Sequence, residues 1–158
     1  MSTIRLDQEI CERVRSHLFS AAGEHFGFLL ADAAVGPDGP IFLVTDFHPI
    51  PDDEVQLTDS GWEVSTDALL DAINAAVRRS QSLIEVHNHP GGWSAFSSTD
   101  REGFEEFVPY VLDSLPGRPY AATVWTKAGT YGEYFRQDGS SGVIRSITAL
   151  GEIGRAHV

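Results

Sequence analysis

Cysteine is almost absent from this sequence. Cys11 is the single cysteine among 158 residues, which excludes an internal disulfide and every zinc site built from several thiolates. A metal ion bound by this chain therefore needs histidine and carboxylate ligands. Cys11 itself is expected in the hydrophobic core.

Basic residues are also scarce. The chain has 11 Lys and Arg against 23 Asp and Glu, which gives a formal net charge of -12. Proteins bind nucleic acid and anionic membranes through clustered Lys and Arg, so neither is an expected partner. An acidic surface attracts a basic protein surface, although the same charge also serves solubility.

Long apolar runs are missing as well. No stretch approaches the roughly 20 apolar residues that cross a bilayer, and the segment from Met1 to Arg15 is polar and mixed in charge, unlike a signal peptide. We therefore expect a cytoplasmic protein without a membrane span. The chain length fits one domain with a single hydrophobic core.

Hydrophobic periodicity predicts helices that alternate with strands. Helical spacing follows Asp7 up to about Ala21, follows Ser65 to Arg79, and begins again at Thr99, where Pro109 is expected to bend the helix. Apolar runs and turn signals predict strands at 26–31, 41–47 and 82–87, and a hairpin at 120–126 and 131–136. The expected fold class is α/β (mixed α+β), a mixed β-sheet flanked by helices in at most three layers.

Two segments lack a clear period. Residues 48–62 are rich in acids, proline and glycine and are expected to form a long exposed connection. Residues 137–142 resemble a flexible link, and 143–150 are expected to form one last short helix before a frayed end. The predicted division is therefore a domain at 1–136, then a link with a C-terminal helix and tail at 137–158.

Two histidines close the predicted strand at 82–87. His87 and His89 are one residue apart, and side chains that alternate along a strand place both on one face, where they can reach a single metal ion. A loop of ten residues then leads to Asp100 at the start of a helix. Two histidines, a carboxylate and one open position are typical of catalytic zinc sites. An isolated His-x-His is more often a pair of surface or capping histidines. The assignment of a metal site therefore depends on the residues before and after this pair.

The wider spacing resembles the signature of the JAMM (MPN, Mov34, JAB) metallopeptidases. His87-Asn88-His89-Pro90 is followed by Ser97 and Asp100, and Glu24 stands far upstream, shortly before a glycine in an apolar strand. The family pattern is Glu with a nearby Gly, then His-Ser/Thr-His-Pro, then Ser-x-x-Asp. Asn88 departs from it at a position that is not expected to ligate the metal, so the departure concerns hydrogen bonding around the ligands.

The resemblance implies a single MPN/JAB1-like (cytidine-deaminase-like) domain with one Zn2+ per chain. It implies that His87, His89 and Asp100 are the metal ligands. By the same resemblance Glu24 takes a proton from the zinc-bound water and passes it to the leaving amine, and Ser97 stabilises the oxyanion. Structural alternatives remain for each: Glu24 as an acceptor for backbone N–H groups, Ser97 as a helix N-cap, and Asp100 as a charge at the helix's positive end.

Several neighbouring side chains have two interpretations. Trp93 and Phe96, in the loop between the ligands, either grip an extended substrate tail or pack under the loop, and Trp62 has the same ambiguity. Glu85 shares a face with His87, where a hydrogen bond to that histidine is one interpretation and a solvated charge is the favoured one. His25 is adjacent to Glu24 and is not an expected ligand.

Within this family, a small stand-alone chain such as this one resembles the prokaryotic JAB proteins. Those proteins act beside ubiquitin-like conjugation or sulfur-carrier systems. The resemblance implies a deubiquitinase-like zinc hydrolase, a peptidase or isopeptidase that cuts after the C-terminal glycine of a ubiquitin-like or sulfur-carrier protein, with adenylating and conjugating enzymes as further partners. The alternative is a non-catalytic MPN scaffold, against which the intact ligand set argues. A zinc deaminase is disfavoured because Pro-Cys-x-x-Cys is missing from a chain with one cysteine.

Overall fold

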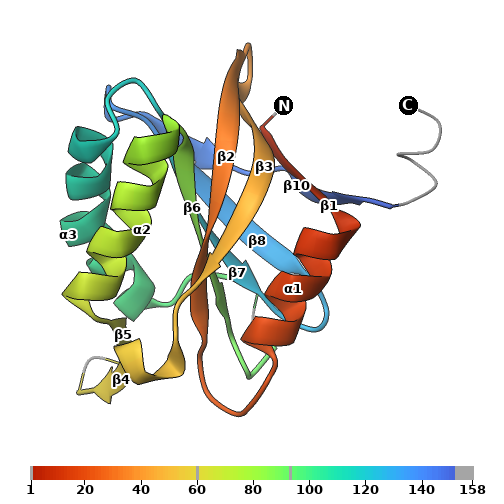
Figure 1. Cartoon of the computed structure of the whole chain (residues 1–158), viewed down its shortest axis with the longest axis vertical. Helices are drawn as coiled ribbons and strands as arrows, with labels where there is room; N and C mark the ends of the chain where they lie inside the picture. Colours follow the sequence, from red (N-terminus) through yellow and green to blue (C-terminus); the bar gives the residue numbers. More distant parts are fainter. Residues whose placement is uncertain (1, 60, 93, 152–158) are drawn as a thin grey trace.

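A mixed sheet forms the middle layer of the protein (Figure 1). The computed structural model describes residues 2–59, 61–92 and 94–151. The helices are α1 Gln8–Leu18, α2 Thr66–Arg79 and α3 Ser98–Ser114. The strands are β1 Thr3–Asp7, β2 Phe26–Gly36, β3 Gly39–Pro49, β4 Val55–Thr58, β5 Gly61–Val64, β6 Ser82–Asn88, β7 Tyr120–Trp125, β8 Thr130–Phe135, β9 Ser141–Val143 and β10 Ser146–Leu150. The large sheet has eight strands in the order β10-β1-β3-β2-β6-β7-β8-β9, which confirms the predicted mixed α/β class.

Helices cover both faces of this sheet. Helix α1 lies on one face, and α2 and α3 lie together on the other (Figure 1). Alternate residues of the central strands feed the two cores: Phe28, Leu30 and Leu83 pack toward α2 and α3, whereas Leu29 and Ile84 pack toward α1. The protein therefore has three layers, as the sequence predicted. No helix in the described ranges is both long and apolar enough to cross a membrane.

The predicted N-caps of the first two long helices are confirmed. Asp7 accepts a hydrogen bond from the backbone N–H of Ile10 at 2.8 Å, and Ser65 accepts one from Ala68 at 3.1 Å. Helix α1 ends at Leu18, three residues before the predicted end at Ala21. The chain that follows leads to Glu24 without joining a helix or strand.

The prediction of a helix at 143–150 is wrong. Ser146 to Leu150 form β10, which runs parallel to β1 with Thr3 opposite Ser146, and Ser141 to Val143 form β9 beside β8. Alternation explains the strand, because the side chains of 146, 148 and 150 are exposed while those of 147 and 149 are half-buried. The sheet therefore continues past the predicted boundary at 136. The predicted link is tied down as well, since Gln137 Nε2 donates to the carbonyl of Leu115 at 2.9 Å. Residues 152–158 of the predicted tail lie outside the described residues.

The segment at 48–62 is more ordered than an exposed connection. It contains a 3-10 turn at Asp52–Glu54 and the hairpin of β4 and β5, which forms a separate two-stranded sheet. Trp62 packs partly buried against the core under α2 and α3. A Cβ atom added to Gly23 would lie 3.1 Å from Cζ2 of Trp62, and one added to Gly61 would lie 3.3 Å from Cγ2 of Thr99. The hairpin therefore contacts both the segment before Glu24 and the first turn of α3.

Candidate metal centre

Strand β6 carries His87 into the centre of the sheet and ends just before His89. It pairs antiparallel with β2 and parallel with β7, and Phe26 is directly opposite His87. Because Glu85 and His87 are two residues apart, both side chains face α2 and α3. His87 is fully buried, and its ring stacks on Phe26 with a centroid distance of 5.4 Å. His89 follows the strand end, and its backbone N–H donates to the carbonyl of Trp125 at 3.1 Å.

A capping box delivers the third side chain. Ser97 is the N-cap of α3, where its hydroxyl accepts from the backbone N–H of Asp100 at 3.1 Å. Oδ2 of Asp100 accepts in return from the backbone N–H of Ser97 at 2.9 Å. The capping alternatives for Ser97 and Asp100 are therefore realised in the structure. They are compatible with a metal site, because the cap itself fixes where the Asp100 carboxylate lies.

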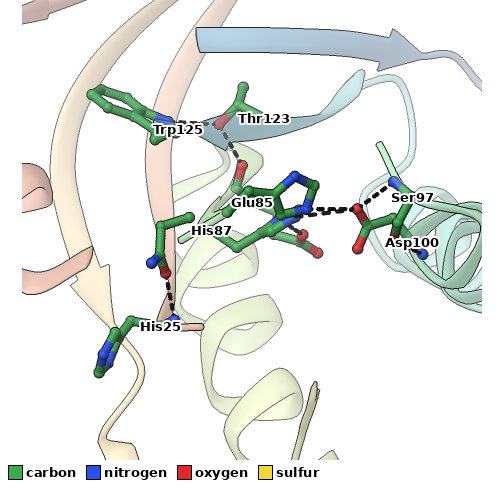
Figure 2. Close-up of polar contacts among 9 residues, drawn as sticks. His25, Glu85, His87, Ser97, Asp100, Thr123 and Trp125 are labelled. Atoms are coloured by element: carbon green, nitrogen blue, oxygen red, sulfur yellow. Dashed lines mark hydrogen bonds and ion pairs between the residues drawn. The ribbon is translucent and has the colours of Figure 1, made fainter. Parts of the chain in front are cut away.

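The three predicted ligand side chains come together, and Figure 2 shows His87 and Asp100 facing each other. Nε2 of His87 lies 3.3 Å from Nε2 of His89, and Oδ2 of Asp100 lies 3.4 Å and 3.1 Å from these two nitrogens. Zinc bonds of about 2.0–2.1 Å in a tetrahedral site keep ligand atoms roughly 3.3 Å apart. The observed triangle therefore fits one zinc ion and leaves a fourth position for a further ligand.

Glu85 fixes the tautomer of the first histidine. Nδ1 of His87 is 2.9 Å from Oε1 of Glu85, and the carboxylate can only accept, so the proton lies on Nδ1. In the neutral ring, this tautomer leaves the lone pair of Nε2 on the side of His89 and Asp100, which is the arrangement a metal-ligating histidine requires. The favoured interpretation of Glu85 as a solvated charge is therefore wrong, because its carboxylate is the hydrogen-bond partner of His87.

Without a metal ion, a proton stabilises the cluster in the place of the ion. Burial alone lowers the pKa of His87, but hydrogen bonds to Asp100 and Glu85 outweigh burial and raise this pKa to about 10. Burial raises the pKa of Asp100, but the hydrogen bond to His87 lowers it. The combined effect holds the pKa of Asp100 well below its ordinary value. The metal-free site is thus a positively charged His87 against an ionised Asp100.

Zinc binding is therefore expected to release a proton. Below about pH 10 the metal-free His87 is protonated, and zinc needs the lone pair that this proton occupies. At pH 7.5 we expect about one proton to leave per zinc bound, and the zinc affinity to fall by about tenfold for each pH unit below that. Calorimetry in two buffers with different ionisation enthalpies measures the release. A binding heat that does not depend on the buffer would show that His87 gives up no proton.

Glu24 lies beside the three ligands but is not one of them. Partial burial raises its pKa, His87 and His89 act to lower it, and the carboxylates of Asp100 and Glu85 act to raise it. The Glu24 carboxylate is therefore within electrostatic range of all four side chains. Among the described residues, the group whose donor atoms lie within 4.8 Å of one another contains His87, His89 and Asp100 without Glu24. This placement is the one expected of a proton acceptor that does not ligate the ion.

For Phe96 the structure shows the packing alternative. Phe96 is 7% exposed and packs under the loop, with Phe104 edge-on at 4.8 Å, Tyr131 at 5.3 Å and the ring of His87 stacked at 6.3 Å between centroids. An aromatic side chain with these contacts supports His87 from behind and has little surface left for a substrate. Trp93, the other predicted substrate-binding residue, lies outside the described residues.

An ion pair that the sequence did not reveal ties α3 to the sheet. Arg101 donates to both carboxylate oxygens of Glu133 on β8 at 2.7 and 2.6 Å, and the Tyr131 hydroxyl donates to the same carboxylate at 2.7 Å. The guanidinium group also lies over the Phe96 ring at 5.3 Å. Since Arg101 follows Asp100, this bidentate pair holds the first turn of α3 beside the cluster of His87, His89 and Asp100. No sequence signal links residues 32 positions apart, because the contact depends on where α3 crosses the sheet.

Comparisons with known proteins support the mixed α/β fold. No protein-family model matches the chain, and no curated protein matches it. Among solved structures, the chain is similar to the solution structure of protein DSY2949 from Desulfitobacterium hafniense, with a TM-score of 0.58 and 17% sequence identity over 96% of this chain and 97% of that one. At this identity the likeness extends to the mixed α/β architecture alone.

Proposed function

We propose that this protein is a zinc-dependent peptidase or isopeptidase of the JAMM (MPN) type. The observation that carries the proposal is the triangle of His87 Nε2, His89 Nε2 and Asp100 Oδ2, with edges of 3.1 to 3.4 Å, and Glu24 beside it. The spacing of these residues in the sequence resembles the family signature. A central mixed sheet with helices on both faces is compatible with an MPN fold.

The chain's own residues divide the chemistry among them. A zinc ion in this triangle would polarise the scissile carbonyl group and lower the pKa of a coordinated water toward neutrality. Glu24 accepts a proton at its carboxylate and returns it to the nitrogen of the leaving amine.

Ser97 is available to stabilise the oxyanion. Its oxygen accepts the N–H of Asp100 at 3.1 Å, and this contact leaves the hydroxyl hydrogen free for another acceptor. A substrate carbonyl oxygen that becomes negative during attack is such an acceptor. Ser97 therefore caps α3 through its oxygen and keeps its O–H group as a donor for the substrate.

The proposed substrate is a ubiquitin-like or sulfur-carrier protein, cut after its C-terminal glycine. The support is the resemblance to prokaryotic JAB proteins, together with an acidic chain that attracts a basic partner surface. Adenylating and conjugating enzymes of the same system are the further partners of this proposal, and the cytoplasm is its compartment. The substrate tail reaches the site as an extended strand.

A cleavage assay separates the enzyme from a non-catalytic MPN scaffold. Zinc-loaded protein is incubated with ubiquitin-like carriers, each bearing a short peptide after the terminal glycine or a lysine peptide in isopeptide linkage. We expect cleavage that stops with 1,10-phenanthroline and returns with added zinc. Tight binding of a carrier without cleavage by fully loaded protein would favour the scaffold.

A further inference from the structure

Asn88, the residue that departs from the family pattern, binds the backbone on either side of Glu24. Its side chain is 2% exposed and points away from the face that His87 occupies. Oδ1 accepts a hydrogen bond from the backbone N–H of His25 at 2.6 Å, the dashed line that ends on His25 in Figure 2. Nδ2 donates to the carbonyl oxygen of Gly23 at 3.1 Å. Both polar atoms of the carboxamide are thus used on one segment.

These two hydrogen bonds hold both peptide groups that flank Glu24. The carbonyl of Gly23 belongs to the peptide that precedes the Cα atom of Glu24, and the N–H of His25 belongs to the peptide that follows it. Peptide groups are planar, so the backbone at Glu24 has two free rotations, one toward each group. Fixing both groups fixes these rotations, and with them the direction in which the Glu24 side chain leaves the backbone.

The segment has no sheet pairing of its own. The ladder between β2 and β6 ends with Phe26 opposite His87, and residues 24 and 25 lie one step beyond it. Asn88 supplies the donor and the acceptor where the backbone ladder stops. The further anchor is the His25 ring, whose nitrogens lie 3.0 Å from Oδ1 of Asp52 and 3.2 Å from the carbonyl of Ala21. The contact between His25 and Asp52 is partly exposed to solvent, because Asp52 is largely exposed. The hydrogen bond from the His25 backbone to Asn88 is buried.

We propose that Asn88 is a positioning residue that holds Glu24 in place beside the metal centre, an inference that rests on the proposed peptidase function. A carboxamide places an acceptor and a donor at two separate points. The serine or threonine of the family pattern donates and accepts through one oxygen on a shorter side chain. Asn88 therefore acts on the reaction through Glu24 and touches neither the substrate nor the ion.

The test compares Asn88→Ala with Gln81→Ala. Gln81 is a matched control, a buried carboxamide before the other end of β6 that donates to Oγ1 of Thr45 at 2.9 Å and to Oδ1 of Asp32 at 3.2 Å. We expect Asn88→Ala to keep its zinc and KM and to lose about 10- to 100-fold in kcat, a fraction of the effect of removing the general base itself. Gln81→Ala should keep the kcat of the wild type. In a Glu24→Gln background, Asn88→Ala should lower the remaining rate no further, because the two residues act as one unit.

Amide hydrogen exchange gives a readout that needs no substrate. The N–H of His25 should exchange at least about tenfold faster in Asn88→Ala and at the wild-type rate in Gln81→Ala. If Asn88→Ala does not fold, Asn88→Asp replaces it: the aspartate keeps the acceptor for His25 and loses the donor to Gly23, so exchange at His25 should stay slow while kcat falls.

The two proposals fail in different ways. If the wild type cleaves its substrate and Asn88→Ala has the same kcat, the positioning role is wrong and the peptidase stands. If Asn88→Ala loses zinc, Asn88 acts on the ligands and the positioning role is again wrong. If the wild type cleaves nothing, the peptidase proposal fails, and the exchange rate at His25 still decides whether Asn88 holds this segment. An unchanged rate overturns the inference.

Discussion

Replacing Glu24 with glutamine is expected to lower kcat for carrier cleavage by about 10²–10⁴-fold, the usual contribution of a general acid–base residue. Glutamine keeps the shape of the side chain but cannot accept the proton that a carboxylate accepts. Zinc content and thermal unfolding should stay as in the wild type, because Glu24 lies outside the ligand triangle. Single-turnover kinetics with elemental analysis of the same samples measures both effects.

The matched control for this variant is Glu63→Gln. Glu63 is an exposed residue of β5, in the hairpin that borders the site, so the variant makes the same chemical change nearby and should cleave at the wild-type rate. Wild-type cleavage by Glu24→Gln would remove the general-base role. Loss of zinc from folded Glu24→Gln would instead make Glu24 a ligand. Retained carrier binding without cleavage would make the variant a substrate trap.

Removing a ligand is expected to abolish zinc retention. We expect about one zinc per chain in the wild type and almost none in His87→Ala or Asp100→Ala after gel filtration, because a three-ligand site loses most of its affinity with any one ligand. Asp100→Ala also removes the acceptor for the N–H of Ser97 and so loosens the first turn of α3. Asp100→Asn keeps an acceptor there and isolates the loss of the metal ligand.

Elemental analysis beside unfolding curves separates these effects. His48→Ala on β3 is the control, since His48 does not belong to the cluster, and it should keep its zinc. Full zinc in both His87→Ala and Asp100→Ala would contradict the assignment of the centre.

The sequence predicts most of the site because most of the site is local. His87 and His89 share a face by strand alternation, and a serine three residues before Asp100 is a capping pattern that fixes the carboxylate within one helical turn. Glu24 is different, because its place depends on the register of β2 against β6, where Phe26 meets His87. The pairing register of two strands cannot be predicted from the residues of either strand alone. Glu24 is therefore predicted only by the resemblance to the family signature.

The errors in the sequence prediction come from short segments and from contacts across the fold. Residues 143–150 have too few apolar positions to separate a strand from a helix, and the partner of β10 lies at the other end of the chain in β1. The sequence does not distinguish packing from substrate contact for Phe96. Its neighbours Phe104 and Tyr131 contact it only because α3 crosses the sheet. Asn88 was recognised as a departure, but its partners are more than 60 residues away.

The intact mass of a carrier fusion after incubation with the zinc-loaded protein tests the central claim most directly. The fusion places a short peptide after the terminal glycine of a ubiquitin-like carrier. We expect two products, one of which is the carrier ending at that glycine, and we expect the uncut fusion when Glu24→Gln replaces the wild type. Uncut fusion across ubiquitin-like and sulfur-carrier proteins, with one zinc per chain confirmed in the same sample, would contradict this claim.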